Sequence, residues 1–343
     1  MATMVTTTGT ANGTGTATMR AAVRDTYGAA GVRLEEVERP ELADDSVLVR
    51  VRAASLNRLD WYTATGTPYI GRPSMGMLKP KQRALGADFA GTVEAVGKEV
   101  TDFRPGDEVF GARTGAFAEY VCARDAVALK PANATFEQAA AVPVAGLTAL
   151  QGLRDKGNVQ PGQKVLVNGA SGGVGTFAVQ VAKALGAEVT AVCSSRHVDL
   201  VRSLGADRVV DYTREDFTRS GERYDVIFDN AGSRSWRECG RVLSPEGTIV
   251  LVGGPKSRVL GPLGHVVRML LRSRLSKRKA VFFISKLNRD DLAVLSDLIE
   301  AGKVTPVVEK TYELGEIADA LRYMGEGHAQ GKVVVRVGAD TAV

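Results

Sequence analysis

A short apolar strand, a glycine-rich turn and an amphipathic helix follow one another without a spacer near the middle of the chain. The strand and turn read Val165-Leu-Val-Asn-Gly-Ala-Ser-Gly-Gly-Val-Gly175, and Thr176-Phe-Ala-Val-Gln-Val-Ala-Lys183 continues as the helix. Gly169, Gly172 and Gly175 stand three residues apart, a variant of the dinucleotide-binding fingerprint. Glycine is needed because the turn is tight, a pyrophosphate approaches the backbone and the helix packs close to its strand. We therefore expect the phosphates at the helix N-terminus, against Ser171, Gly172, Gly173 and Val174.

Strands and helices alternate from Thr148 to about Ser285. Short apolar runs are separated there by stretches that fit helices, which is typical of a parallel, doubly wound α/β sheet. The strands are expected at Lys164–Asn168, Glu188–Cys193, Arg208–Asp211, Asp225–Asn230, Thr248–Gly253 and Lys279–Ser285.

The N-terminal third has a different pattern, in which Gly, Pro and Asp interrupt short β-branched runs. Ser46–Ala53, Gly91–Gly97 and Asp107–Gly111 are examples. This spacing favours an antiparallel, barrel-like domain.

A chain of 343 residues is too long for one ordinary core, so two domains are expected. The C-terminal end is mixed, with helices expected near 289–301 and 316–324 and a last strand at 332–337. The simplest organisation is a barrel domain at 19–147, a dinucleotide domain at 148–285 and a return to the barrel domain at 286–343.

Residues 1–18 are almost all Thr, Gly and Ala and carry no charge. They lack the features of secretory signals and transit peptides, so we expect a flexible tail and a folded chain from Met19. The cysteines Cys122, Cys193 and Cys239 are scattered and odd in number, which argues against a disulfide framework. We therefore expect a reducing, cytoplasmic location.

Several motifs occur together in one order and spacing. Gly86-Ala-Asp-Phe-Ala-Gly-Thr-Val-Glu-Ala-Val-Gly97, Pro105-Gly-Asp-Glu-Val-Phe110, Gly115-Ala-Phe-Ala-Glu-Tyr120 and the turn at 168–175 resemble the medium-chain dehydrogenase/reductase superfamily. Within it, the chain is most similar to the zinc-independent quinone oxidoreductase branch. The resemblance implies a GroES-like barrel domain, a Rossmann domain, an active site in the cleft between them, and homodimers that pair Rossmann edge strands.

The end of the second Rossmann strand selects the coenzyme. An acidic residue about 20 positions past the glycines binds the ribose of NAD, but Ser194, Ser195 and Arg196 occupy this region. Hydroxyls and a guanidinium suit a 2′-phosphate, and the resemblance implies that Tyr212 borders it. We therefore expect NADPH rather than NADH; the alternative makes Arg196 a solvated charge and Asp199 the ribose ligand.

A zinc ion is not expected, either catalytic or structural. His197, His265 and His328 are far apart and no Cys-x-x-Cys pair occurs, whereas zinc sites need three or four Cys, His or acidic ligands. By resemblance, Asn57 stands at the position where zinc alcohol dehydrogenases carry a cysteine, and Gly86-Ala-Asp88 stands where they carry Gly-His-Glu.

The segment Ser55-Leu-Asn-Arg-Leu-Asp-Trp-Tyr62 resembles the active-site segment of the quinone oxidoreductase branch. Neutral donors such as Asn57 and Tyr62 could stabilise the oxygen that becomes an enolate or phenolate after hydride transfer. Asp60 is expected to orient its neighbours, and Tyr69 could line the same mouth. The alternative is that Asn57 and Asp60 only cap a turn.

Further coenzyme contacts are expected from segments that follow parallel strands, because ligands bind at the carboxyl ends of such strands. The segments are Asn230, Ala231 and Gly232, and Val252, Gly253 and Gly254. The resemblance adds Thr148 on the nicotinamide side, and Phe282 and Phe283 as an apolar pocket edge that could equally be dimer core. Lys332, just before the last strand, is a weaker candidate, since surface lysines are usually only solvated.

The chain has a formal net charge of +5, but its basic character is local. Eight Lys and Arg residues and no acid lie between Lys256 and Lys279. Within residues 262–279, Leu263, Val267 and Leu271 recur at helical spacing, which predicts a basic amphipathic helix. It is either a lid over the substrate or a contact to an anionic membrane surface.

These observations predict a zinc-free, NADPH-dependent reductase of quinones or of activated carbon–carbon double bonds, as in enones and enals. Its substrate would be a small, lipophilic quinone or carbonyl compound. The runner-up is a zinc-free alcohol dehydrogenase or carbonyl reductase on the same scaffold. A more remote alternative is a non-catalytic, crystallin-like or nucleic-acid-binding role, although no aromatic platform accompanies the basic segment and no specific nucleic acid is expected.

Overall fold

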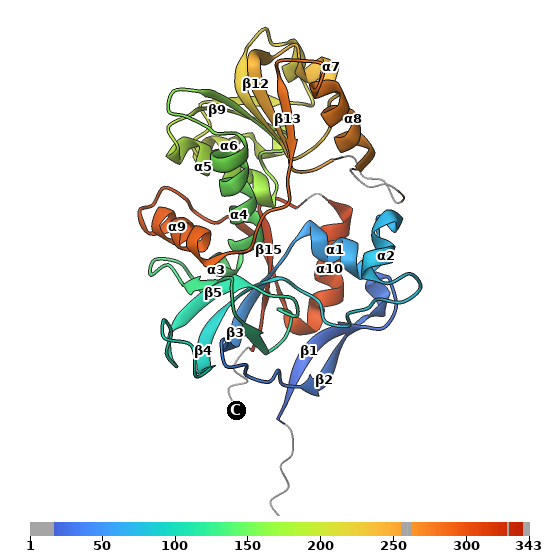
Figure 1. The fold of residues 1–343 in the computed structure, drawn as a ribbon, viewed down its shortest axis with the longest axis vertical. Helices are drawn as coiled ribbons and strands as arrows, with labels where there is room; N and C mark the ends of the chain where they lie inside the picture. Colours follow the sequence, from blue (N-terminus) through green and yellow to red (C-terminus); the bar gives the residue numbers. More distant parts are fainter. Residues whose placement is uncertain (1–16, 255–258, 260–262, 328, 339–343) are drawn as a thin grey trace, which may run out of the picture.

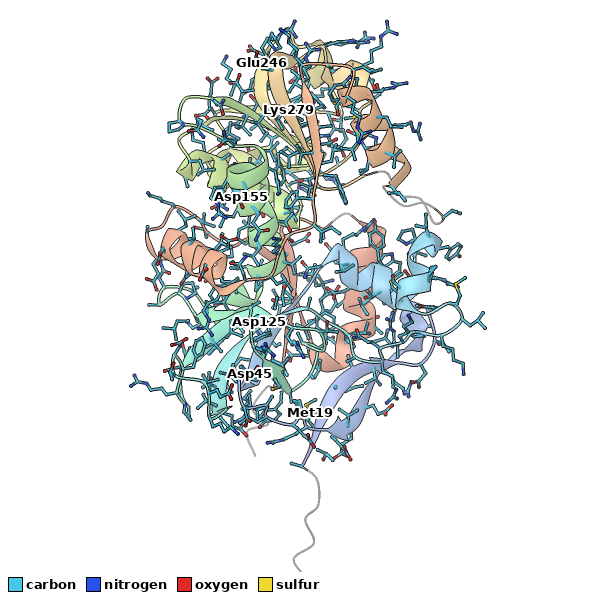
Figure 2. The ribbon with its side chains drawn as sticks, in the orientation of Figure 1. Met19, Asp45, Asp125, Asp155, Glu246 and Lys279 are labelled. Atoms are coloured by element: carbon cyan, nitrogen blue, oxygen red, sulfur yellow. The ribbon has the colours of Figure 1, made fainter. Side chains whose placement is uncertain are left out.

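The computed structural model of the chain describes residues 17–254, 259, 263–327 and 329–338. Two large sheets are stacked along the long axis of the molecule (Figure 1). Met19, Asp45 and Asp125 lie toward one end of this axis, and Glu246 and Lys279 lie toward the other (Figure 2). No helix within the described ranges has the length and apolar character to cross a bilayer.

The first sheet has six strands in the order β10-β9-β8-β11-β12-β13, and every neighbouring pair is parallel. This is the doubly wound order of dinucleotide-binding folds, so the predicted α/β architecture is confirmed. Val165, Leu166 and Val167 of β8 are fully buried, as expected for a strand covered on both faces. The strands are β8 (Lys164–Asn168), β9 (Glu188–Cys193), β10 (Arg208–Asp211), β11 (Tyr224–Asp229), β12 (Leu243–Leu251) and β13 (Lys279–Phe282).

Helices cover both faces of this parallel sheet, with α5 and α6 on one side and α7 and α8 on the other (Figure 1). Their apolar faces supply the covering that a parallel sheet requires. The helices of this part are α4 (Pro143–Gln151), α5 (Gly173–Ala184), α6 (Val198–Ser203), α7 (Trp236–Cys239), α8 (Leu263–Ser273) and α9 (Arg289–Glu300).

The second sheet follows the path β14-β15-β3-β4-β5-β7, with β6 paired to β3 and mainly antiparallel neighbours. It forms the expected barrel-like part, and Val49, Phe89, Val109 and Phe117 lie fully buried in its core. Its strands are β3 (Val47–Leu56), β4 (Asp88–Val96), β5 (Glu108–Ala112), β6 (Tyr120–Ala123), β7 (Val127–Leu129), β14 (Val308–Glu313) and β15 (Lys332–Arg336), with the separate pair β1 (Thr18–Arg24) and β2 (Val32–Glu38).

Four helices accompany the barrel-like part. The sequence expectation of a helix near 316–324 corresponds to α10, and the expected last strand corresponds to β15. The helices are α1 (Arg58–Thr65), α2 (Arg72–Met75), α3 (Phe136–Ala140) and α10 (Ile317–Glu326).

The segment before β15 joins the two sheets. Gly331 donates its N–H to the carbonyl oxygen of Ser171 at 2.8 Å, and Gly172 and Gly331 form an isolated parallel bridge. The strand that follows then pairs with β3. The C-terminal segment therefore lies directly against the glycine-rich turn of the parallel sheet.

Several expected element boundaries were wrong, and the following three are examples. Strand β1 begins at Thr18, so the expected tail at 1–18 is too long; residues 1–16 lie outside the described part. Strand β12 begins at Leu243, five positions before the expected Thr248, because pairing with β11 extends through a register shift. Strand β13 ends at Phe282 rather than Ser285, where its pairing with β12 stops.

Candidate active site between the two sheets

The glycine-rich turn joins β8 to α5, and its glycines are required sterically. A Cβ on Gly175 would lie 2.1 Å from the carbonyl oxygen of Gly169, so no larger residue fits. Gly169 has φ +86°, a conformation that favours glycine. Helix α5 begins at Gly173, so the first N–H groups of the helix, which have no acceptor within it, lie at this turn. The geometry suits a pyrophosphate, in agreement with the fingerprint.

The segments after β11 and β12 press against each other beside this turn. Asn230 donates its N–H to the carbonyl oxygen of Asn168 at 3.0 Å. A Cβ on Gly253 would lie 2.0 Å from the carbonyl oxygen of Asn230, and one on Gly232 would lie 2.3 Å from Cα of Gly254. The structure thus brings together the segments 230–232 and 252–254 that the sequence analysis expected to touch the coenzyme.

Lys332 is buried, which makes the interpretation of this residue as a solvated surface lysine wrong. Its Nζ donates to Oδ1 of Asn57 at 2.6 Å and to Oδ2 of Asp88 at 3.2 Å. Its side chain passes the glycine-rich turn: Cδ lies 3.0 Å from the position that a Cβ of Gly173 would take. Lys332 therefore links the turn to the barrel-like part with a buried positive charge.

The sequence analysis did not identify Asp88 as a site residue. Asp88 is fully buried at the start of β4, and its carboxylate accepts hydrogen bonds from Ser55 Oγ at 3.2 Å and from the Asn57 amide at 2.9 Å. The N–H of Val144 at the start of α4 also donates to it, at 3.1 Å. These donors and the Lys332 ammonium compensate the buried charge. The sequence signal that could have identified Asp88 is a carboxylate at the first position of an otherwise mainly apolar strand.

Asp60 lies next to this cluster and has a perturbed acidity. Its carboxylate accepts the backbone N–H of Asn57 at 2.6 Å and is buried. The pKa of Asp60 is raised to about 7, mainly by burial; the nearby charge of Asp88 also raises it, whereas the Asn57 N–H and Lys332 lower it. The capping interpretation holds for Asp60, whereas the Asn57 side chain turns toward Asp88 and Lys332.

The two candidate tyrosines do not join this cluster. Tyr62 is half-buried on α1, with the guanidinium of Arg58 5.6 Å from its ring centre. Tyr69 is 46% exposed, and neither hydroxyl hydrogen-bonds to the Asn57–Asp88–Lys332 cluster. The next residue, Ile70, contacts a segment that follows β12 in the sequence: its N–H donates to the carbonyl oxygen of Val259 at 3.1 Å.

Thr148 lies on α4, the helix whose first turn contacts Asp88. Its hydroxyl donates to the carbonyl oxygen of Val144 at 2.7 Å and contacts Ser285 Oγ at 3.0 Å.

Phe283 packs beside Gly152 in the core of the parallel sheet, while Phe282 is 41% exposed at the sheet edge. An exposed aromatic residue on an edge strand suits the dimer-core alternative better than the nicotinamide pocket.

The expected adenosine end of the site carries one feature that the sequence analysis missed. The hydroxyl of Ser195 hydrogen-bonds to the carboxylate of Asp211 and contacts Thr213 Oγ1 at 3.0 Å. The bond from Ser195 is the main cause that lowers the pKa of Asp211. Arg196 and Tyr212 are exposed nearby, so two predicted phosphate contacts share this surface with a carboxylate.

No group of three His, Cys, Asp or Glu side chains in the described ranges is arranged to hold a metal ion. By resemblance, Asn57 stands where zinc alcohol dehydrogenases carry a cysteine, and Asp88 ends the segment that stands where they carry Gly-His-Glu. Both residues are hydrogen-bonded to the Lys332 ammonium. A cation in contact with both residues repels a divalent metal ion at this position.

Comparisons with known proteins agree on one family. The family model described as "Alcohol dehydrogenase GroES-like domain" matches residues 43–150, and the model described as "Zinc-binding dehydrogenase" matches residues 204–335. Among curated proteins, the chain is 34% identical over 337 residues to the chloroplastic quinone-oxidoreductase QR1 of Triphysaria versicolor, covering 92% of this chain and 98% of that protein. It is also 34% identical over 340 residues to the chloroplastic NADPH-dependent alkenal/one oxidoreductase of Arabidopsis thaliana, covering 92% and 79%. Among solved structures, the quinone oxidoreductase from Coxiella burnetii superposes with a TM-score of 0.82 at 29% identity, covering 94% of this chain and all of that one.

Proposed function

This chain belongs to the quinone oxidoreductase-like branch of the medium-chain dehydrogenase/reductase superfamily, and from that premise we propose that it reduces quinones or activated carbon–carbon double bonds with NADPH. The observation that carries the proposal is the buried Lys332, whose aliphatic chain passes the glycine-rich turn and whose ammonium contacts the Asn57–Asp88 pair. Two relatives are named for reactions of these types, a quinone oxidoreductase and an alkenal/one oxidoreductase.

The nicotinamide coenzyme, when bound, supplies the hydride. This chain holds its phosphates at the α5 N-terminus, where Gly172 and Gly173 leave the backbone accessible and Gly175 allows the tight turn. Reduction of a quinone or enone places negative charge on the substrate oxygen. The Lys332 ammonium and the Asn57 amide are polar groups fixed beside the turn, and such preorganised donors stabilise developing charge in a buried site.

Asp60 acts as a positioning residue in this proposal. Its carboxylate holds the backbone of Asn57, whose side chain accepts from Lys332 and donates to Asp88. The protonation state of Asp60 therefore affects the charge beside Lys332 without direct contact to the substrate.

We propose that the chain works without zinc. Asn57 and Asp88, from the two segments that correspond to the zinc-binding segments of the zinc enzymes, contact Lys332, and the ammonium group supplies a positive charge there in place of a metal ion. The test is the activity of protein dialysed against a chelator, which we expect to be unchanged.

The preference for NADPH over NADH is supported by the neutral Ser194 and Ser195 and by the exposed Arg196 at the end of β9. The nearby carboxylate of Asp211 acts in the opposite sense, but it pairs with Arg214 at 3.4 Å. Arg196 and Arg214 together attract a doubly charged 2′-phosphate more strongly than the single carboxylate of Asp211 repels it.

A homodimer and a membrane contact are two further parts of the proposal. The edge strand β13 exposes Phe282, which suits pairing with a second copy. Helix α8 exposes Leu263, Val267 and Leu271 on one ridge, beside the exposed Arg268. An apolar ridge with a basic flank suits the surface of an anionic membrane, from which lipophilic substrates could enter.

Flotation with anionic liposomes tests the membrane contact. The variant Arg268→Glu/Arg272→Glu is expected to leave the liposome fraction, while Lys98→Glu on a turn of the barrel-like part stays with it. Equal recovery of wild type and double variant in the soluble fraction contradicts the membrane contact.

A cytoplasmic location is the accompanying proposal, supported by three free cysteines, of which Cys193 and Cys239 are buried.

The experiment that tests the main proposal is NADPH oxidation with a panel of quinones, enones, enals and alcohols. We expect turnover of quinones or enones, and a fall of at least 100-fold in kcat for Lys332→Met. Because that variant leaves Asp88 buried and unpaired, its loss of activity could reflect unfolding. The double variant Lys332→Met/Asp88→Asn removes both charges and is expected to fold, to bind NADPH and to remain inactive. The exposed Lys303→Met is the matched control. Full activity of the double variant contradicts the role of the ammonium, and turnover of alcohols alone favours the alcohol dehydrogenase alternative.

A further inference from the structure

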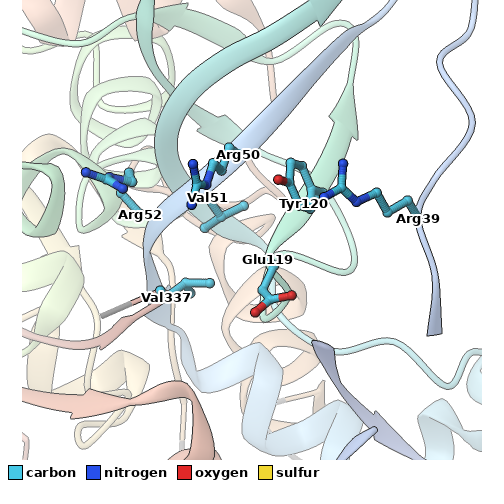
Figure 3. Close-up of a pocket in the computed structure, with 8 residues that line it drawn as sticks. Arg39, Arg50, Val51, Arg52, Glu119, Tyr120 and Val337 are labelled. Atoms are coloured by element: carbon cyan, nitrogen blue, oxygen red, sulfur yellow. The ribbon is translucent and has the colours of Figure 1, made fainter. Parts of the chain in front are cut away.

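A hollow lined by arginines lies on the barrel-like part, away from the candidate active site. It has a volume of about 230 Å³, and Figure 3 shows its lining. Arg50 and Arg52 lie near the middle of β3, whereas Asn57 follows the end of the same strand. Seven residues of extended chain separate Arg50 from Asn57, which corresponds to roughly 23 Å. The arginine hollow is therefore a separate place on the molecule.

The carboxylates around the hollow already have partners. Arg39 pairs with Glu94 at 3.2 Å and stacks on the ring of Tyr120 at 3.8 Å. Glu119 accepts both the backbone N–H and the guanidinium of Arg20, each at 2.8 Å. These contacts neutralise two of the four arginines in the neighbourhood.

Arg50 and Arg52 form no ion pair with any residue in the described ranges. They stand two positions apart on β3, so their side chains leave the same face of the strand, about 7 Å apart along it. A second hollow of about 360 Å³ shares both arginines and adds Thr92, Val93 and Glu94. Two uncompensated guanidinium groups thus face two adjoining hollows.

The backbone beneath these arginines is fixed on both sides. Arg50 lies opposite Thr92 of β4 and opposite Tyr120 of β6. The carbonyl oxygen of Arg52 accepts the N–H of Val337 at 2.9 Å. The backbone positions of the two arginines are therefore set before a ligand arrives, which lowers the entropic cost of binding.

We propose that the arginine hollow binds a compact anion with two phosphate groups. Guanidinium groups match phosphate oxygens through paired N–H donors, and two of them at this spacing can each engage one phosphate. A volume of about 230 Å³ is smaller than the sites of drug-sized ligands, so the hollow accepts a diphosphate rather than a whole dinucleotide. Arg39, paired with Glu94 and held over Tyr120, lies at the edge of the hollow.

Calorimetric titration with inorganic pyrophosphate tests this proposal, with the full chain saturated in NADPH so that the glycine-rich turn is filled. We expect binding of one pyrophosphate per chain, more tightly than orthophosphate, and a loss of at least tenfold in affinity for Arg50→Gln/Arg52→Gln. Arg104→Gln, an exposed arginine on a neighbouring turn, is the matched control and should bind like wild type. NADPH affinity of the double variant should be unchanged, because the hollow is remote from the turn.

Absence of binding to the wild type overturns the proposal, and so does equal affinity of the double variant and the wild type. Orthophosphate that binds as tightly as pyrophosphate overturns the diphosphate assignment. Arg50 is exposed, Arg52 is half-buried, and neither forms an ion pair in the described ranges, so circular dichroism should show the same melting temperature for the variant and the wild type. Since the readout is the affinity for pyrophosphate, the result does not depend on which substrate the enzyme reduces.

Discussion

Nε2 of His265 lies 3.9 Å from Oδ2 of Asp229, and both atoms are buried without a hydrogen-bond partner among the described residues. His265 belongs to α8 and Asp229 ends β11, so the pair joins the basic helix to the parallel sheet. Burial raises the pKa of Asp229, although the N–H of Gly232 and the amide of Asn168 act against this. An unsatisfied carboxylate oxygen in this place destabilises the fold.

Replacing Asp229 by Asn should therefore stabilise the protein above neutral pH. The retained oxygen still accepts from Gly232 and Asn168, both of which contact Oδ1 at 2.8 Å. The new amide can donate to Nε2 of His265 after a small shift. We expect a gain of about 1–3 kcal/mol in unfolding free energy at pH 8, measured by urea denaturation. The double variant Asp229→Asn/His265→Phe is the control, and the gain should shrink when the acceptor is removed. A loss of stability in Asp229→Asn would show that the ionised pair is favourable.

Asp60 should make stability fall with rising pH. Its folded-state pKa of about 7 lies above the value of 3.8 of an ordinary aspartate, so the folded protein binds this proton more tightly than the unfolded chain. The contribution is present below pH 4 and is lost progressively between pH 4 and 7. The variant Asp60→Asn should lack this decline and be more stable than wild type at pH 8 by roughly 2–4 kcal/mol. Thermal melts across this range measure it, and parallel curves for the two proteins contradict it.

Gly175 should tolerate no side chain. A Cβ there would lie 2.1 Å from the carbonyl oxygen of Gly169, so Gly175→Ala must push α5 away from its strand. We expect a loss of several kcal/mol in stability and at least tenfold weaker NADPH binding. Gly315→Ala is the matched control, because nothing lies within 4 Å of its Cβ position. If Gly175→Ala fails to fold, nucleotide protection of the wild type against thermal unfolding still tests the site. Normal NADPH affinity in a folded Gly175→Ala contradicts the assignment of this turn.

The parts of the site that could be predicted are local in sequence. The strand, turn and helix around Gly175 form from neighbouring residues, so their pattern alone indicates a dinucleotide site. The cluster around Lys332 is different: its contact with Asn57 spans 275 positions, and it depends on how β15 returns beside β3. Sequence spacing carries no signal for such a contact. A lysine in front of a strand therefore predicts a solvated side chain, and only the fold shows its burial.

Asp211 illustrates a second limit. Counting along the chain from the glycines leads to Ser195, but the carboxylate that contacts this hydroxyl comes from the neighbouring strand β10. Parallel pairing of β9 and β10 places Asp211 opposite Cys193. The surface expected to contact the adenosine end of the coenzyme is thus formed by two strand ends, of which the fingerprint describes only one.

The coenzyme preference should therefore respond in opposite directions to two substitutions. Arg196→Asp removes a positive charge beside the expected 2′-phosphate and should lower the ratio of kcat/KM for NADPH to that for NADH by about 10–100-fold, as expected for the loss of a charge-assisted hydrogen bond. Asp211→Asn removes a negative charge, keeps an acceptor for Ser195 and should raise the same ratio several-fold. Arg219→Gln, which lies on a separate turn and pairs with Asp216 at 3.9 Å, is the control and should leave the ratio unchanged. A ratio unaffected by both substitutions, together with a loss of NADH use in Asp199→Asn, favours Asp199 as the ribose ligand instead.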